Sequence, residues 1–371
     1  MTTSVPDLAP ICAQFPFAGR FVAGVPHGSG HINDTYAVTF DQGGSSTRYI
    51  LQRINHRIFR DVPRLMENIA RVSAHVTAQV RSAPPGNPPQ QALTLVPTRS
   101  GENYYREPNG AFWRAYVFVE HASTHDLVTS PKLAREAAFS FGNFQRQLAN
   151  LAGPRLHETI PNFHHTRQRF LAFERALAAD PRGRAASVKA EVDFARKRES
   201  LVDLLLNLHA AGDVAERVTH NDTKTNNVMI DDATGVGICV IDLDTVMPGL
   251  SLYDFGDMVR SATNAAAEDE RDLTRVESQL RIFDALVSGY LAATRTLLNP
   301  IEIDHLATAG RLMTFEVGLR FLTDYLEGDV YFKIKRPDHN LDRCRNQFAL
   351  VASMEKQKDA MEGIVRQHRL S

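Results

Sequence analysis

The chain has 371 residues, of which 43% are hydrophobic and 23% are charged, and its formal net charge is −1. These proportions are close to those of an average soluble globular protein, and they exclude a wholly disordered, collagen-like or coiled-coil chain. Because 42 Lys and Arg residues are balanced by 43 Asp and Glu residues, the chain lacks the large basic surface that binding to a nucleic-acid backbone requires.

Length and cysteine usage limit the architecture and the compartment. At roughly 150 residues per domain, the length predicts two domains or one large two-lobed body. The three cysteines, Cys12, Cys239 and Cys344, are widely spaced, which disfavours a disulfide framework or a zinc site. Residues 1–15 lack the pattern of a signal peptide, and the apolar-rich stretch 201–211 is too short and too polar to span a bilayer. We therefore expect a cytoplasmic protein without membrane partners, either a monomer or a weak homodimer.

The first third of the chain is predicted to be rich in strands. A helix is expected over 61–80, where apolar residues recur at spacings of three and four and Asp61 can cap the start. The proline-rich segment 82–91 predicts a loop. The expected strands lie at 20–25, 35–40, 48–53, 92–97 and 111–119.

After His121 the pattern becomes mostly helical. Helices are expected at 131–151, at 188–211 and over much of the chain from 272 onward. A short hairpin of strands at 228–230 and 237–241 interrupts them. The sequence therefore predicts an α+β chain with a small antiparallel β-sheet lobe and one helix in residues 1–120. A larger, mostly helical lobe would occupy residues 121–371.

The most informative segment, 218–260, carries polar residues whose chemistry suits phosphoryl transfer. Asp222 is expected on a loop between a helix and a strand, where its carboxylate can accept a hydroxyl proton. Asn227 and Asp242 offer one amide and one carboxylate oxygen, which with phosphates and waters suit Mg²⁺. Lys224 lies two residues after Asp222 and can neutralise a transferring phosphoryl group. Asp222 and Lys224 are thus the candidate catalytic residues.

Two further residues near the candidate site have open roles. Asp244 would face the same side as Asp242 if the strand continued, so it is either a metal or substrate contact or a solvated turn residue. His220 is expected to be a hydrogen-bonding residue of the loop rather than the catalytic base.

The pattern H-x-D-x-x-x-x-N followed by a strand-end aspartate resembles the catalytic core of kinase-like phosphotransferases. That group includes aminoglycoside phosphotransferases, choline kinases and protein kinases, and the pattern is matched here by His220, Asp222, Asn227 and Asp242. The resemblance implies a bilobal, protein-kinase-like fold, ATP as the phosphoryl donor and Mg²⁺ as the metal. It also implies that Asp254 begins a helix that buttresses the catalytic loop, as a supporting or capping residue.

Glycines between the first two expected strands mark the candidate nucleotide loop. Gly28, Ser29 and Gly30 would let backbone donors approach phosphates. Asn33 stands where protein kinases have a third glycine. By resemblance, backbone groups near Glu120 and Ala122 are also expected to bind the nucleotide, at its adenine.

The third expected strand lacks the lysine that such kinases use to hold nucleotide phosphates. Gln52 occupies its position and can donate to a phosphate oxygen without carrying charge. Arg53 would serve only if the strand is bulged or ends there, because neighbouring side chains alternate between faces. Glu67 is the helix residue that would pair with the missing lysine, or else a solvated surface residue.

Longer segments resemble the N-acetylhexosamine 1-kinases, and the Gln52 departure is shared with that group. The resemblance implies transfer of the ATP γ-phosphoryl group to the anomeric hydroxyl of GlcNAc or GalNAc. The candidate substrate-binding residues are His31, Asn33 and Asp34 on the glycine-containing loop and Arg320 on a helix expected at 315–325. The resembling segments are 28–36, 49–55, 220–231, 239–260 and 318–347.

Two alternatives stay open. One is a kinase of another small hydroxyl compound, such as choline, homoserine or an aminoglycoside. The other is a pseudokinase-like module that binds a nucleotide and recruits a partner. The presence of Asp222, Asn227 and Asp242 counts against the second alternative.

Overall fold

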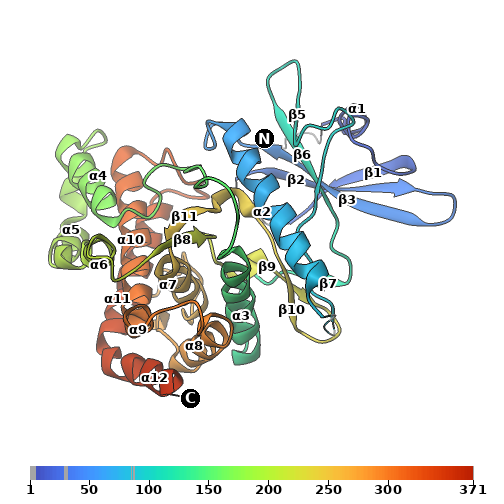
Figure 1. The fold of residues 1–371 in the computed structure, drawn as a ribbon. Helices are drawn as coiled ribbons and strands as arrows, with labels where there is room; N and C mark the ends of the chain where they lie inside the picture. Colours follow the sequence, from blue (N-terminus) through green and yellow to red (C-terminus); the bar gives the residue numbers. More distant parts are fainter. Residues whose placement is uncertain (1–5, 29–31, 85, 87, 371) are drawn as a thin grey trace.

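The computed structural model describes residues 6–28, 32–84, 86 and 88–370 and shows two lobes. One lobe is an antiparallel sheet with helix α2 beside it, and the other is mostly helical (Figure 1). This is the α+β arrangement that the sequence predicts. None of the helices in the described ranges has the length and apolar character needed to cross a membrane.

The smaller lobe is built on a sheet with the strand order β1-β2-β3-β6-β4, in which β5 also pairs with β6. The register of β3 and β6 places Gln52 directly opposite Arg114, so these two side chains share one face of the sheet. A short helix, α1 (Ala9–Cys12), packs beside the sheet. The strands are β1 (Arg20–Pro26), β2 (Asp34–Asp41), β3 (Ser46–Ile54), β4 (Leu95–Val96), β5 (Tyr105–Arg106) and β6 (Phe112–Val117).

Helix α2 (Val62–Ser82) joins the two lobes through its apolar face. Asp61 caps its start, as predicted, because the Asp61 Oδ1 atom accepts a hydrogen bond of 3.1 Å from the Arg64 amide. Along the helix, Leu65 and Ile69 are buried in a cluster that includes Tyr116 of β6 and Phe144 of the larger lobe. One apolar stripe at helical spacing therefore packs against both lobes.

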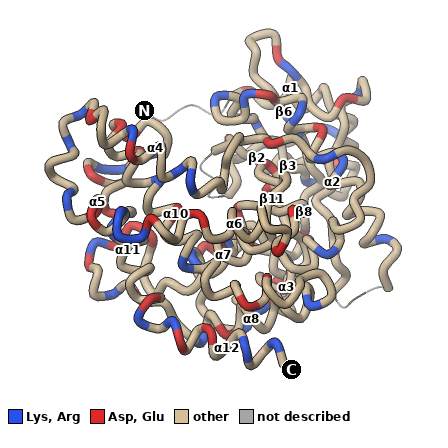
Figure 2. The backbone as a smooth tube through the Cα atoms, turned by 60° about the vertical axis from the view of Figure 1, so that its left-hand side comes forward, with Lys and Arg blue, Asp and Glu red and all other residues tan. Residues whose placement is uncertain are grey.

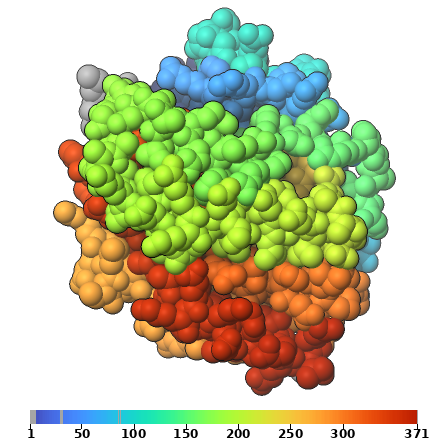
Figure 3. Space-filling view, turned by 90° about the vertical axis from the view of Figure 1, so that its left-hand side faces the viewer, coloured from blue at the N-terminus to red at the C-terminus, as the bar shows by residue number. Residues whose placement is uncertain are grey.

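The larger lobe surrounds the long helix α10, most of which is buried. Helices α4, α7 and α11 pack against α10, and α3 packs against α8. Figure 3 shows that the region of α4 to α6 covers one face of this lobe, between the smaller lobe and the C-terminal helices. The helices are α3 (Pro131–Leu148), α4 (Thr166–Ala179), α5 (Lys189–Arg196), α6 (Leu204–Ala210), α7 (Ser251–Ala262), α8 (Leu280–Thr294), α9 (Pro300–Asp304), α10 (Leu306–Glu327), α11 (His339–Lys356) and α12 (Lys358–Leu370).

Two small antiparallel sheets lie where the larger lobe meets the smaller one. Their strand orders are β10-β9-β7 and β11-β8. The predicted boundary between residues 120 and 121 falls between β6 and β7, and the division into domains there stays a prediction. The strands are β7 (Ala122–Ser123), β8 (Glu216–Thr219), β9 (Val228–Asp231), β10 (Gly237–Val240) and β11 (Met247–Leu250).

Most expected elements are present, but three differ. The strand expected at 92–97 is reduced to Leu95–Val96, and the helix expected at 131–151 ends at Leu148. The helix expected at 188–211 is broken into α5, a 3₁₀ turn and α6. At the break, Arg198 leaves the helical conformation and its guanidinium binds Glu355 of α11 at 2.6 and 2.9 Å. This tertiary ion pair outweighs the helical propensity of the segment.

Lysine, arginine, aspartate and glutamate are interspersed over both lobes (Figure 2). Many of them form surface ion pairs, such as Arg155 with Glu216 and Arg196 with Glu174. Exposed pairs of this kind add little stability.

We predict that Gly289→Ala in α8 destabilises the fold by about 3 kcal/mol or more. An alanine Cβ at this position would lie 2.1 Å from the carbonyl oxygen of Arg135 in α3, so the two helices would have to separate. The free energy of unfolding in urea measures the effect. Gly363→Ala in α12 is the control, because the nearest atom to its Cβ would be an Arg366 side-chain nitrogen at 3.8 Å, an ordinary contact distance. This variant should gain up to about 1 kcal/mol of stability. Equal stability changes in the two variants would contradict the close packing of α3 and α8.

Candidate active site

Helix α7 anchors the segment 220–227, which we call the catalytic loop. Asp254, in the first turn of α7, is completely buried. Its carboxylate accepts hydrogen bonds from the amides of His220 and Asn221, at 2.9 and 2.7 Å. Asn221 has a φ of 65°, a left-handed conformation that asparagine tolerates better than most residues. The structure thus confirms that Asp254 supports the loop, although it does not cap its own helix, which starts after Leu250.

Other parts of the larger lobe hold the same loop. The His220 Nε2 atom donates to the carbonyl oxygen of Ile241 at 2.9 Å, which confirms a structural role for this histidine. On the other side, His164 Nε2 donates to the carbonyl oxygen of Asn221 at 2.9 Å, and His164 Nδ1 lies 2.7 Å from the carboxylate of Glu316 in α10. The conformation of the catalytic loop is therefore held by hydrogen bonds to Asp254, Ile241 and His164.

Asp222 projects from this loop with 27% of its side chain exposed. Its Oδ1 atom lies 2.9 Å from Lys224 Nζ, and its Oδ2 atom accepts a hydrogen bond of 3.2 Å from Asn227 Nδ2. Burial alone would raise the pKa of Asp222, but the charge and hydrogen bond of Lys224 outweigh it and lower the pKa to about 2. The carboxylate is therefore ionised throughout the neutral pH range.

Asp242 follows β10 and opens onto the space between the lobes. Its φ is 59°, so the chain turns sharply as the strand ends. Its carboxylate forms no hydrogen bond or ion pair with any residue that the structure describes. Although the residue is exposed at the cleft surface, desolvation by the surrounding protein and the nearby carboxylates of Asp244 and Asp222 raise its pKa to about 7. A bound cation would relieve that repulsion and favour the ionised form.

Asn227 adds a neutral oxygen beside Asp242. Its side-chain nitrogen is used, because it donates to the backbone oxygen of Asp222 at 2.8 Å. Its side-chain oxygen accepts no hydrogen bond in the described part of the chain. Within the described ranges no group of three or more His, Cys, Asp or Glu residues could hold a metal ion. A Mg²⁺ ion at Asn227 and Asp242 would therefore need nucleotide phosphates and water to complete its oxygen shell.

Asp244 differs from Asp242 because both of its carboxylate oxygens are engaged. One accepts from Arg114 in β6, and the other accepts a hydrogen bond of 2.6 Å from Asn33 Nδ2. Asp244 is also buried, with 3% of its surface exposed. It therefore links the larger lobe to the smaller one and is a weaker candidate metal ligand than Asp242. Its metal role stays a prediction.

A cavity of about 400 Å³ lies between the lobes and brings several predicted residues together. Its apolar lining includes residues of β6 and of the segment that follows it, Met229 of β9, and Ile241, which follows β10. Such a cavity is of the size expected for a small-molecule site. The predicted residues that line it are Gly28, Gln52, Ala122, Asn227 and Asp242.

Among the described residues predicted to bind the nucleotide, Glu120 does not line this cavity. The carboxylate of Glu120 pairs with Arg48 on the surface, so any contact of residue 120 with a nucleotide would come from its backbone. Ser29 and Gly30 lie outside the described residues. Glu67 points away from the cavity, to His157 at 2.9 Å.

The predicted substrate residues are divided among three places. Asp34 pairs with Arg53 and both line a separate cavity of about 330 Å³ that also contacts Lys333. Arg320 lines a third cavity, of about 150 Å³. Asn33 is bound to Asp244, as described above, and its Oδ1 atom accepts from the Asn55 amide at 2.9 Å. His31 lies outside the described residues.

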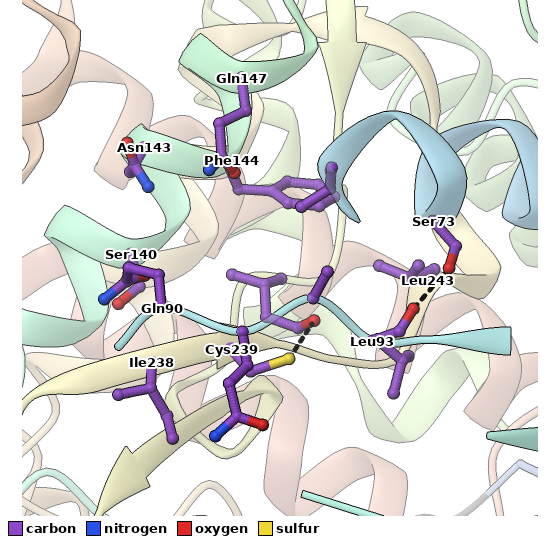
Figure 4. Close-up of a pocket in the computed structure, with 14 residues that line it drawn as sticks. Ser73, Gln90, Leu93, Ser140, Asn143, Phe144, Gln147, Ile238, Cys239 and Leu243 are labelled. Carbon is purple, nitrogen blue, oxygen red and sulfur yellow. Dashed lines mark hydrogen bonds between the residues drawn. The ribbon is translucent and has the colours of Figure 1, made fainter. Parts of the chain in front are cut away.

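A fourth cavity, between α2, α3 and β10, has space for about 20 Å³ and is a packing gap (Figure 4). It is large enough for a single water molecule. Ser73 on its wall donates to the backbone oxygen of Leu93 at 2.6 Å. Cys239, also on the wall, is buried as predicted.

Arg114 is the residue at this site that sequence reasoning missed. It is 1% exposed, and its guanidinium contacts Gln52 as well as Asp244. A basic residue in the last long strand of the smaller lobe was the available signal. Its significance depends on the register of β3 and β6, which the sequence does not reveal.

The model of the phosphotransferase enzyme family matches residues 24–287. The chain belongs to this family. This membership confirms the resemblance to kinase-like phosphotransferases.

Solved structures of similar fold include three kinases. An aminoglycoside phosphotransferase from Alicyclobacillus acidocaldarius is 13% identical, with a TM-score of 0.59 over 99% of this chain and 98% of that one. A choline kinase from Cryptosporidium parvum is 11% identical, with a TM-score of 0.57 over 98% of each chain. An amicoumacin kinase, solved with AMP-PNP and Ca²⁺, is 11% identical, with a TM-score of 0.57 over 92% of each chain. At these identities the similarity concerns the fold, and it confirms the predicted kinase-like fold class.

We predict that Asp254→Ala destabilises the protein by about 3 kcal/mol, because it leaves two buried amides without an acceptor. The phosphotransferase should also lose more turnover than nucleotide affinity, since the Asp254 side chain contacts the catalytic loop and Gln145 of α3 and does not line the cavity between the lobes. Urea unfolding, steady-state kinetics and calorimetric titration with ADP measure the three quantities. Asp193→Ala on the exposed side of α5 is the control. An Asp254→Ala variant with unchanged turnover would show that the loop does not need this support.

Proposed function

We propose that this phosphotransferase is a Mg²⁺- and ATP-dependent kinase that phosphorylates the anomeric hydroxyl of an N-acetylhexosamine. The observation that carries the kinase assignment is the adjacency of the ionised Asp222 to Asn227 and Asp242, whose free oxygens face the interlobe cavity. The choice of sugar rests on the sequence resemblance in five segments along the chain. The products would be ADP and the sugar 1-phosphate.

Asp222 would accept a hydrogen bond from the acceptor hydroxyl and orient its oxygen toward the terminal phosphorus. A carboxylate of low pKa is a weak base, but phosphoryl transfer passes through a loose transition state in which positioning matters more than base strength. Lys224, which is 44% exposed and already paired with Asp222, would neutralise charge that develops on the transferred group. The proton would leave the hydroxyl for Asp222 late in the reaction.

Asn227 and Asp242 would hold the cation, and the cation would supply charge neutralisation for the nucleotide phosphates. One amide oxygen and one carboxylate suit Mg²⁺, which keeps several waters and is often bound together with substrate phosphates. The amicoumacin kinase of similar fold was solved with AMP-PNP and Ca²⁺, which supports a divalent cation and a nucleotide in this cleft.

The adenine would occupy the apolar end of the 400 Å³ cavity. Phe118, Val119 and Met229 are among the apolar residues that line this cavity. Backbone groups near Glu120 and Ala122 would form its hydrogen bonds, as in the resembling kinases. The Gly28 end of the same lining would approach the phosphates.

Arginines near the catalytic loop favour a neutral acceptor over a cationic one. Arg320 lies over the ring of Phe163, with 4.9 Å between the guanidinium carbon and the ring centroid. Arg169 and Arg320 both line the cavity of about 150 Å³. Burial together with the charge of Arg320 lowers the pKa of Arg169 to about 10. His164, next to Phe163, binds the catalytic loop. Two guanidinium groups repel choline or an aminoglycoside, whereas they can donate to sugar and acetyl oxygens.

An ADP-release assay over a set of acceptors tests the proposed function. We expect turnover with GlcNAc or GalNAc and none with their methyl glycosides, because the methyl group blocks the anomeric hydroxyl. Phosphorus NMR of the product should show a phosphate on C1. Turnover with choline, homoserine or an aminoglycoside, and not with these sugars, would favour a kinase of another small hydroxyl compound. ATP binding without turnover on any acceptor would favour the nucleotide-binding module.

We predict that Asp222→Asn lowers kcat by a factor of about 10² to 10⁴, because the amide cannot accept the proton. The dissociation constant for Mg·ATP should stay within about threefold of the native value. Rapid-quench kinetics and calorimetry separate the two effects. Asp359→Asn, on the exposed first turn of α12, is the control. A near-native kcat in Asp222→Asn would remove this residue from the reaction.

We predict that Asp242→Ala abolishes most of the gain in ADP affinity that Mg²⁺ confers, a factor of about ten or more in the native protein. ADP binding without divalent cations should change much less, since Asp242 then only repels phosphates. Calorimetric titrations with and without Mg²⁺ give both quantities. An unchanged Mg²⁺ effect would place the cation elsewhere.

A further inference from the structure

The described lining of the cavity between the lobes contains a buried arginine, which comes from β6 rather than β3. Among the described residues that line the cavity, Arg114 is the only arginine or lysine. Arg53, the neighbour of Gln52 on β3, is paired with Asp34 and lines the separate cavity of about 330 Å³. Lys224 is paired with Asp222 and is absent from the lining. A polyphosphate in this cavity would therefore meet a single fixed positive charge.

The guanidinium of Arg114 is held in a defined orientation. Its Nε atom donates to Gln52 Oε1 at 2.9 Å, and its Nη1 atom donates to Asp244. Gln52 is itself held, because its Nε2 atom donates to Thr35 Oγ1 at 2.9 Å. The Nη2 group of Arg114 donates to no residue that the structure describes. The planar group thus keeps donors for a ligand after its structural bonds are made.

A second polar group beside Arg114 also lacks a partner. Tyr116, two residues further along β6 and on the same face, lines the cavity and is 2% exposed. Its hydroxyl is buried and forms no hydrogen bond with any described residue. The guanidinium carbon of Arg114 lies 5.4 Å from the Tyr116 ring centroid. A buried, unpartnered hydroxyl next to a buried arginine indicates that the cavity binds an oxygen-rich ligand.

We propose that Arg114 holds the α- and β-phosphates of the nucleotide from β6, with Gln52 and Asp244 as the residues that orient it. Gln52 therefore acts on the phosphates through Arg114, in addition to any direct contact. Asp244 is then an anchor for this arginine and connects the phosphate site to the strand end that carries Asp242. An arginine suits the task because its planar donors can bind a phosphate while two other N–H groups are already engaged.

The inference rests on the proposed nucleotide site, and calorimetry with adenosine, AMP, ADP and ATP in the presence of a chelator tests it. Arg114→Met should weaken ADP and ATP binding by about 10- to 100-fold while leaving adenosine binding within about twofold. Gln52→Leu should cause a loss of about threefold to tenfold with the same dependence on phosphates. These losses support Arg114 as a phosphate-binding residue.

Two variants keep the test valid if Arg114→Met fails to fold. Arg114→Lys keeps a positive charge for Asp244 but lacks the planar donors. The pair Arg114→Gln and Asp244→Asn in one chain keeps a hydrogen bond and leaves no unpaired buried charge. Both should lose phosphate-dependent affinity while adenosine binds as in the native protein.

Three outcomes would overturn the proposal. In the first, the variants bind ADP and ATP as tightly as the native protein. In the second, adenosine and ATP weaken by equal factors, which would make Arg114 only a structural partner of Asp244. In the third, the native protein binds no nucleotide, which would also remove the proposed function. A native protein that binds ATP but phosphorylates no sugar would overturn the acceptor alone, and the comparison of Arg114 variants would keep its meaning.

Discussion

The site depends on the hydrogen bonds that the carboxylate of Asp254 accepts from the amides of His220 and Asn221. These bonds satisfy two backbone amides in the turn that precedes Asp222. They also attach that turn to helix α7, which lies in the core of the larger lobe. Because Asn221 adopts a left-handed conformation, the loop would relax without this support. The position of Asp222 is therefore set by a residue that never approaches a substrate.

A second connection relates the two lobes. Arg114 and Asn33 from the smaller lobe both donate to Asp244, which follows the strand that ends at Val240. The same segment carries Asp242, whose carboxylate has no hydrogen-bond or ion-pair partner within the described part of the chain. Two aspartates two residues apart thus have different surroundings, because Asp244 is buried among donors and Asp242 faces the cavity. In the proposed function, this arrangement fixes the position of the cation at Asp242 relative to the phosphates at Arg114.

Contacts that depend on local spacing could be predicted from the sequence. Asp222, Asn227 and Asp242 lie close together because a loop followed by a hairpin joins them over a short stretch of chain, and the support from Asp254 follows from the start of the next helix. Their catalytic and metal-binding roles stay predictions. The α+β division and most strands could be predicted as well, because their hydrophobic periods are clear. The break at Arg198 could not, since it depends on Glu355, which is far away in the sequence.

Contacts between segments that are distant in the chain could not be predicted from the sequence. The position of Arg114 at the site depends on its register with Gln52, and Asn33 and Asp34 contact Asp244 and Arg53, partners that the sequence does not reveal.

The central claim is that Asp222, Asn227 and Asp242 surround one metal–nucleotide complex. A crystal structure with Mg²⁺ and a non-hydrolysable ATP analogue tests it most directly. The account predicts a cation at about 2.1 Å from oxygens of Asp242 and Asn227, with Asp222 facing the terminal phosphate. A nucleotide bound outside this cavity, or a cation that contacts neither residue, would contradict it.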